Sequence, residues 1–192
     1  MRFLYRDKVN IPTNYSVTRA VLDILLDFEE STGLFATPYR RTIRGWRKLN
    51  GEPEPPPWRY NRAIKYLKDR AKIKIIKKNN QKFLKLTRTG KLQALLARID
   101  QDFKKHPVWD GKWRLVIWDI PEKSRNDRNR LRQLVKDLDF LQLQKSVFIT
   151  PYPLPASAVE YLKESKLIRY IRFLRVDKIE DDRYLKKRFA LK

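Results

Sequence analysis

The sequence predicts a mixed α/β (α+β) protein made of two domains. In the first, residues 1–107, helices precede two strands joined by a tight turn. In the second, residues 108–192, strands and helices alternate in the order β-α-β-β-α-β. Pro107 and Gly111 interrupt the pattern between them and mark the division. The chain has 192 residues, 42% of them hydrophobic, which is enough to bury two cores.

The first domain begins with three predicted helices. Residues 15–30 carry apolar side chains at helical spacing and predict the first of them. Residues 38–49 are expected to form a short basic helix. The four prolines in residues 51–57 exclude a regular helix or a central strand in that following segment. Residues 58–70 predict the third helix, whose apolar face is formed by Ala63, Ile64 and Leu67.

Two short strands and a last helix complete the first domain. Residues 72–78 and 81–87 are rich in Ile, Phe and Leu, and Asn79-Asn80 between them suits a two-residue hairpin because Asn tolerates positive φ. A further helix is expected from Thr89 onwards. This order of helices and hairpin predicts a winged helix-turn-helix, which presents its third helix and its wing to DNA.

The charge distribution supports a nucleic-acid partner. The chain has 45 Lys and Arg against 22 Asp and Glu, a net charge of +23, and residues 59–91 contain thirteen basic residues but one acid, Asp69. Double-stranded DNA is the expected partner, and the alternatives are a solvated basic face or contact with anionic lipid or another acidic macromolecule. The candidate DNA-binding residues are Arg59, Tyr60, Asn61, Arg62, Lys65, Lys68 and Arg70 in the third helix and Lys77, Lys78 and Lys82 around the hairpin tip.

The second domain has the element order of a ferredoxin-like α/β sandwich. Ser124 is expected to cap its first helix, and the tail after residue 176 is expected to hold a short helix or an edge strand. The predicted elements are a strand at 113–118, a helix at 124–139, two strands within 140–150 joined near Lys145, a helix at 156–165 and a strand at 167–176.

Composition also excludes several kinds of site. Without cysteine there is no disulfide framework and no thiolate metal site. The single histidine, His106, excludes a His-rich metal cluster within one chain. No apolar run approaches the ~20 residues that span a bilayer, and the N-terminus lacks the apolar core of a signal peptide. A cytoplasmic protein that does not enter a membrane is therefore expected.

Two segments of the second domain carry a family resemblance. KWRLVIWDIPEK at 112–123 and LQLQKSVFITPYP at 141–153 resemble the central domain of the phenylacetate-type transcriptional repressors, the PaaX family. That domain is itself similar to the small CRISPR-associated endonuclease of the Cas-two family, and the resemblance covers residues 112–177. A winged helix followed by a ferredoxin-like domain is the repressor architecture. The sequence is too short for the repressors' further C-terminal helical domain, so their acyl-CoA effector is not carried over.

The resemblance also assigns a possible role to Asp119. In the Cas-two family the acid at this place is a divalent-metal ligand, and two copies in a homodimer would share one Mg²⁺. Alternatively, Asp119 accepts backbone N–H bonds in the turn before the next helix. In the second segment, Gln144, Lys145 and Ser146 form either a dimer surface or phosphate contact, or simply a strand junction.

The sequence thus predicts a DNA-binding transcriptional regulator, repressor-like, with a homodimer formed by the ferredoxin-like domain. The alternative is a Mg²⁺-dependent Cas-two-like endonuclease with an added DNA-binding domain. A third interpretation is an RNA-binding accessory protein, since a ferredoxin-like sheet also binds RNA.

Overall fold

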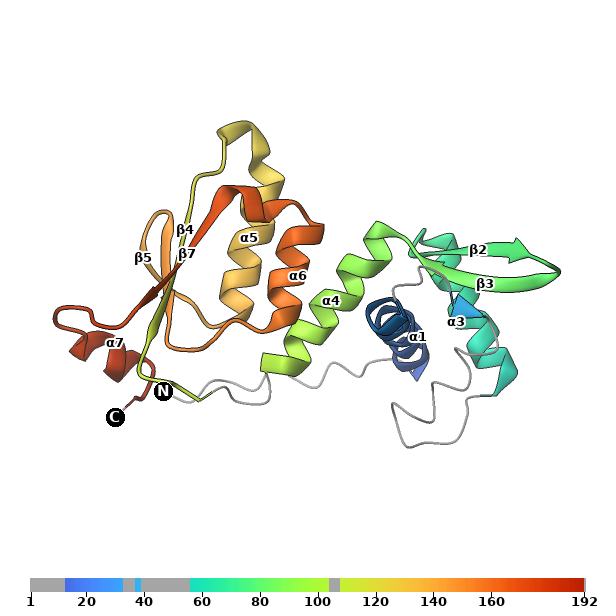
Figure 1. The fold of residues 1–192 in the computed structure, drawn as a ribbon, viewed down its shortest axis with the longest axis horizontal. Helices are drawn as coiled ribbons and strands as arrows, with labels where there is room; N and C mark the ends of the chain where they lie inside the picture. The colour runs from blue at the N-terminus through green and yellow to red at the C-terminus, as the bar shows by residue number, and fades with distance from the viewer. Residues whose placement is uncertain (1–12, 33–36, 39–55, 104–107, 192) are drawn as a thin grey trace. The chain divides into compact units, whose positions relative to one another are not determined.

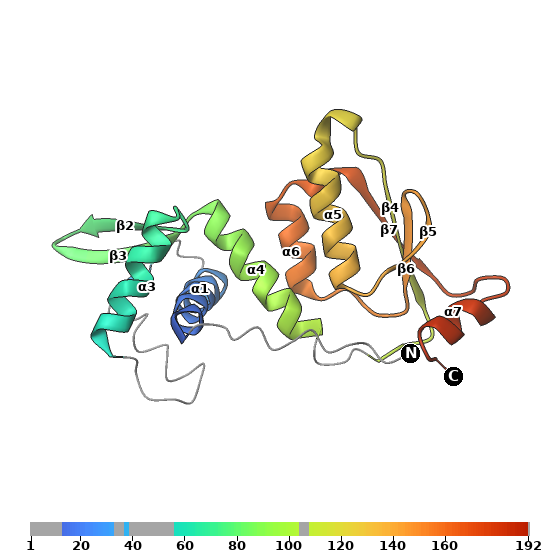
Figure 2. The same ribbon diagram turned by 180° about the vertical axis from the view of Figure 1, so that it is seen from behind.

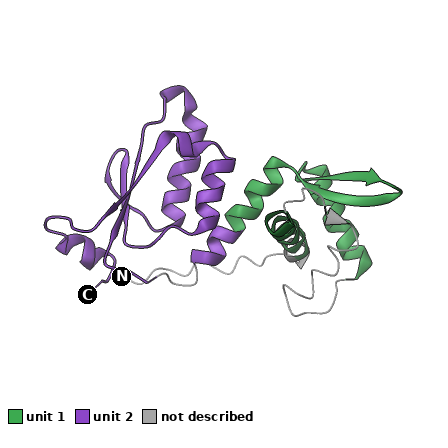
Figure 3. Ribbon diagram, in the orientation of Figure 1, with its two compact units in different colours: residues 1–97 green, residues 98–192 purple. Residues whose placement is uncertain are grey.

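The chain falls into two compact units, residues 1–97 and 98–192 (Figure 3). The computed structural model describes residues 13–32, 37–38, 56–103 and 108–191. The mixed α/β architecture is confirmed, while the predicted division after residue 107 stays a prediction. In the described part of the chain no helix has the length and apolar character needed to cross a membrane.

The first unit combines helices with a three-stranded sheet of order β1-β3-β2 (Figure 1). The predicted helices at 15–30 and 58–70 and both hairpin strands are present. The predicted helix at 38–49 lies outside the described residues except for Pro38, which is in a strand. The elements are α1 (Thr13–Thr32), β1 (Thr37–Pro38), α3 (Pro57–Asp69), β2 (Ile73–Lys78), β3 (Gln81–Leu86) and α4 (Arg88–Phe103), whose residues after Ala97 belong to the second unit.

Helical and strand periodicities both direct apolar side chains into the core of this unit. In α3 the inward face includes Leu67, which is fully buried, and Pro57 suits the first turn because its fixed φ is already helical. In the hairpin, Ile73 pairs with Leu86 and both are buried. Asn79 and Asn80 have φ values of 48° and 57°, which confirms the predicted two-residue turn.

The start of α4 is fixed to the loop that joins α3 to β2. The backbone N–H of Gly90 donates to Thr87 Oγ1 at 3.1 Å, so Thr87 caps α4. The Thr87 hydroxyl also donates to the carbonyl of Ala71 at 2.6 Å, and its backbone N–H donates to Lys72 O at 3.0 Å. A Cβ on Gly90 would lie 2.0 Å from Lys72 O, so only glycine permits this approach.

The second unit has the predicted β-α-β-β-α-β order. Its four strands form an antiparallel sheet of order β5-β6-β4-β7, which places β4 and β6 in the centre. Two views of the ribbon show α5 and α6 side by side along one face of this sheet and α7 near the other (Figures 1 and 2). The elements are β4 (Trp113–Trp118), α5 (Arg125–Asp137), β5 (Leu141–Gln144), β6 (Val147–Thr150), α6 (Ala156–Glu164), β7 (Ile171–Val176) and α7 (Arg183–Arg188).

Each face of this sheet carries packed aromatic side chains. On one face the rings of Trp118 and Phe148 stack with centroids 4.2 Å apart. On the other, Trp113 and Ile149 form a cluster with Leu185 and Phe189 from the C-terminal segment. Successive side chains along β4 point to opposite faces of the sheet, so Trp113 packs on one face and Trp118 on the other.

Two local predictions need correction. Residues 167–170 form a 3₁₀ helix, so the last strand begins at Ile171. The chain turns sharply at Lys166, where φ is 63°, and this lets Leu167 enter the core before the strand starts. Ser124 does precede α5, but its side chain makes no capping hydrogen bond, because a 3₁₀ turn at Glu122–Ser124 leads into the helix.

Replacing Gly90 with alanine should destabilise the first unit by about 1–3 kcal/mol, since the new methyl group meets the Lys72 carbonyl. Inside a helix, alanine otherwise stabilises by about 1 kcal/mol relative to glycine. A loss of stability in Gly90→Ala would therefore show that the contact with the Lys72 carbonyl outweighs helix propensity. Urea unfolding followed by circular dichroism measures it. Leu96→Ala, at an exposed position of the same helix, serves as the control, and a stability gain in Gly90→Ala would contradict the packing.

Candidate nucleic-acid interface

An open basin lies between α3 and the β2–β3 hairpin, with a volume of about 780 Å³. Its apolar floor includes Ile64 and Ile73. Lysines from three elements line it: Lys68 from α3, Lys74 and Lys77 from β2 and Lys82 from β3. We call these four residues the basin lysines. A concave surface with several cations around an apolar floor suits a polyanion better than a neutral ligand.

The positive charge of the basin lysines is not neutralised by nearby acids. Lys77 and Lys82 lie directly opposite each other across the hairpin, and like charges in this position destabilise a strand pair. The side chains of all four make no ion pair or hydrogen bond with a described residue. The hairpin therefore holds an electrostatic repulsion that a bound anion would relieve.

The outer side of α3 adds further cations. Arg62 and Lys65 are exposed and have no ion-pair partner in the described part of the chain, and Asn61 is exposed beside them. Arg59 is half-buried, and its guanidinium lies 5.9 Å from the ring centre of Trp58. Arg70 follows the end of α3 and stands over the Tyr66 ring at 5.3 Å.

Tyr60 does not belong to this surface. Its side chain is only 2% exposed, so the prediction that it contacts a base or sugar is corrected. The reason is helical spacing, because Tyr60 is three and four residues before Ala63 and Ile64 and shares their inward face. At the other end of the candidate set, Lys78 is exposed and pairs across the hairpin with Gln81.

In the second unit, Asp119 lies at the end of β4 and is exposed. Its backbone N–H donates to the carbonyl of Tyr170 at 3.0 Å, and the preceding Trp118 N–H donates to Ser146 O at 3.1 Å. Its carboxylate makes no hydrogen bond or ion pair with the described residues, so the structure shows no turn-capping role for this side chain.

Asp119 does not belong to a cluster of acidic side chains in the part of the chain that the structure describes. Within the described ranges, no group of three or more His, Asp or Glu side chains gathers where it could hold an ion. Asp119 supplies one carboxylate, and Mg²⁺ bound largely through water usually uses one or two carboxylates together with substrate phosphates.

Comparison with known families finds a similarity in the second unit. Residues 106–186 match the family model of the PaaX protein central Cas2-like domain. These residues are therefore similar to that domain. The resemblance carried by the segments at 112–123 and 141–153 is thereby confirmed. No curated protein matches the chain.

The second segment that carries the resemblance lies close to the first. Gln144 ends β5 beside a register shift in its pairing with β6, Lys145 is exposed in the turn, and Ser146 is half-buried. The contact between Ser146 O and Trp118 N brings this turn to the end of β4. The structure thus accounts for these residues as a strand junction, and a dimer or phosphate contact stays a prediction.

Three residues at the interface of the first unit were missed by sequence reasoning. Lys74 lines the basin, and Trp58 and Tyr66 are 61% and 48% exposed on α3. A helical projection gives the signal for the aromatic pair, because Trp58 is four residues before Arg62 and therefore on the polar side. Lys74 gave no comparable signal. Strand alternation predicts that its side chain lies on the opposite face of β2 from Ile73 and Ile75, yet all three residues line the basin.

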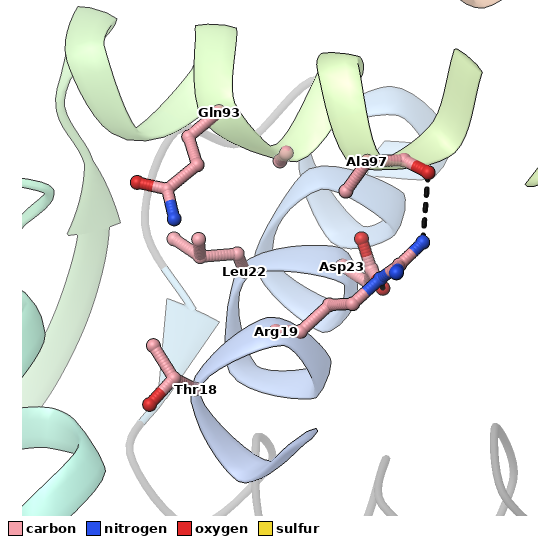
Figure 4. A pocket seen from close by; sticks show the side chains of 7 residues that line it. Thr18, Arg19, Leu22, Asp23, Gln93 and Ala97 are labelled. Atoms are coloured by element: carbon pink, nitrogen blue, oxygen red, sulfur yellow. Dashed lines mark hydrogen bonds and ion pairs between the residues drawn. The ribbon is translucent and has the colours of Figure 1, made fainter. Parts of the chain in front are cut away.

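A second hollow in the first unit is too small for an effector. It lies between α1 and α4, where the Arg19 guanidinium donates to the carbonyl of Ala97 at 2.7 Å (Figure 4). Its volume is about 10 Å³, which is room for one water molecule. Arg19 also lies 3.8 Å from Asp23 in the next turn of α1. This arrangement joins two helices and does not form a ligand pocket.

Lys82→Glu should stabilise the first unit, because a favourable cross-strand pair with Lys77 replaces a repulsive one. The expected gain is about 0.5 kcal/mol at low salt, and it should shrink as salt screens the pair. Urea unfolding at several salt concentrations measures the effect. Lys82→Gln removes the repulsion without adding attraction and should give a smaller gain, whereas a stability loss in both variants would show that Lys82 is a structural residue.

Proposed function

We propose that the chain is a DNA-binding transcriptional regulator, repressor-like, whose first unit is a winged helix. In this proposal α3 enters the major groove and the β2–β3 hairpin is the wing. The observation that carries it is the set of basin lysines, whose side chains have no ion-pair partner among the described residues and two of which face each other. The chain order of helices and hairpin in the first unit supports the assignment.

The second unit is proposed to be a ferredoxin-like domain that joins two copies of the chain. The strand order β5-β6-β4-β7 and the β-α-β-β-α-β sequence of elements support the ferredoxin-like assignment, and the PaaX-type match supports a role in a regulator of that kind. A dimer would present two winged helices to paired half-sites about one helical turn apart.

The salt dependence of binding tests the DNA interface. If about five cations contact phosphate, log K plotted against log salt should have a slope of about −4 to −5. A variant with Lys77, Lys78 and Lys82 all replaced by alanine should bind more weakly, with a slope less steep by about 2 to 3. Fluorescence anisotropy with a labelled duplex measures both quantities.

A charge-matched control lies on α5 of the second unit. Arg125, Arg132 and Lys136 are exposed and have no partner among the described residues, so their replacement by alanine removes the same charge elsewhere. This variant should keep the wild-type slope. Equal losses in the two variants would mean that net charge alone attracts DNA, and a flat salt response in the wild type would refute the interface.

A nuclease is the second candidate function, favoured by the exposed carboxylate of Asp119 in a Cas2-like domain. Under the regulator proposal, purified protein with Mg²⁺ or Mn²⁺ should leave labelled DNA and RNA intact even at high protein concentration. Gel electrophoresis of the products measures this. Cleavage that is abolished by Asp119→Ala, with DNA affinity retained, would replace the regulator proposal with the nuclease.

A further inference from the structure

Two aromatic side chains stand on the solvent side of α3 among its cations. Trp58 is 61% exposed and Tyr66 is 48% exposed. Trp58 precedes Arg62 by four residues and Lys65 by seven, so the three lie along one side of the helix. The buried face, formed by Tyr60, Ala63, Ile64 and Leu67, is on the opposite side.

Packing within the first unit does not account for this exposure. An aromatic side chain that stays in water forgoes the stabilisation of burial, about 25 cal/mol for each Å² of apolar surface. Single exposed apolar residues are common on proteins. Here, however, two large rings lie on one short cationic helix, and each has a guanidinium above it, that of Arg59 or Arg70. Trp, Tyr and Arg are the residues that most often carry binding energy at interfaces.

The chemistry of a duplex decides what such rings can touch. Stacked bases hide their faces, and the major groove exposes only base edges and the methyl group of thymine. Arginine and lysine bind the O6 and N7 atoms of guanine there, whereas apolar side chains contact the thymine methyl. A helix side that carries both Arg62 and Trp58 therefore offers a polar and an apolar contact to neighbouring base pairs.

We propose that Trp58, supported by Tyr66, is a sequence-reading residue that contacts thymine methyl groups in the major groove. The inference rests on the proposed DNA-binding function and assigns the outer side of α3 to base contacts and the basin lysines to phosphate contacts. Because a thymine contact is apolar, loss of Trp58 lowers affinity without changing the number of counterions released. The two kinds of contact therefore respond differently to salt.

The experiment compares two duplexes of about 25 base pairs, long enough for two half-sites, of the same mixed sequence. One contains thymine and the other contains uracil at every thymine position, which removes only the methyl groups. The wild type should bind the uracil duplex about fourfold more weakly for each methyl group that Trp58 buries, equivalent to 0.8 kcal/mol. Trp58→Ala should bind the thymine duplex about tenfold more weakly, should no longer distinguish the duplexes, and should keep the wild-type salt slope.

Two variants guard against indirect effects. Trp58→Phe keeps an aromatic ring and should retain most of the affinity and the preference for thymine. Tyr184→Ala removes an aromatic side chain that is 65% exposed on α7 of the second unit, and it should behave as the wild type. Circular dichroism and the thermal midpoint confirm that each variant is folded, which is expected because both rings are largely in solvent.

The possible outcomes separate this inference from the function on which it rests. If Trp58→Ala matches the wild type while the Lys77/Lys78/Lys82 variant binds weakly, the inference fails and the DNA-binding function stands. If the loss appears only with single-stranded oligothymidine, the ring stacks on unpaired bases and the groove contact is refuted. An equal loss in Tyr184→Ala also refutes it. If the wild type binds no duplex, both proposals fail.

Discussion

The close approach of α4 to the loop after α3 is the constraint on which the first unit depends. Two backbone carbonyls, those of Ala71 and Lys72, accept hydrogen bonds from Thr87, and Gly90 lies so near Lys72 O that no side chain fits. The same loop ends α3 and begins β2. The angle between helix and hairpin, and with it the shape of the basin, is therefore fixed by backbone contacts. The side chains of the basin lysines can change conformation without altering these backbone contacts.

The packing at the base of the hairpin also explains how the hairpin tolerates two like charges opposite each other. Lys77 and Lys82 are opposed at the hairpin end farthest from the core, where water screens the repulsion. Nearer the core, the pair of Ile73 and Leu86 is buried and maintains the register. A cost of a few tenths of a kcal/mol at the tip is small beside the burial of two such side chains. Stability is supplied at the base of the hairpin, and charge is displayed at its tip.

Much of the fold followed from periodicity and turn chemistry, and the parts that did not follow depend on tertiary context. The strand at Trp113–Trp118 and the turn at Asn79-Asn80 were predicted because each has a local cause. The inward position of Tyr60 was also available from helical spacing, but its phenol group suggested a contact with nucleic acid. By contrast, residues 167–170 have a strand-like sequence pattern but form a 3₁₀ helix, which places Leu167 in the core. The sequence pattern does not reveal this packing. The basin could not be read from the sequence, because three separate elements meet to form it.

The two segments that carry the PaaX resemblance have a structural reason to occur together. Trp118 from the first segment stacks on Phe148 from the second at 4.2 Å, and its N–H binds the carbonyl of Ser146 at 3.1 Å. These contacts fix the end of β4 against the β5–β6 turn and leave the Asp119 carboxylate outside, without a partner in the described part of the chain. Such a pair of segments is required by the packing of the sheet whether or not the acid has a catalytic role. The resemblance therefore supports the fold of the second unit more strongly than it supports nuclease activity, and the proposal of nucleic-acid binding rests on the charges of the first unit.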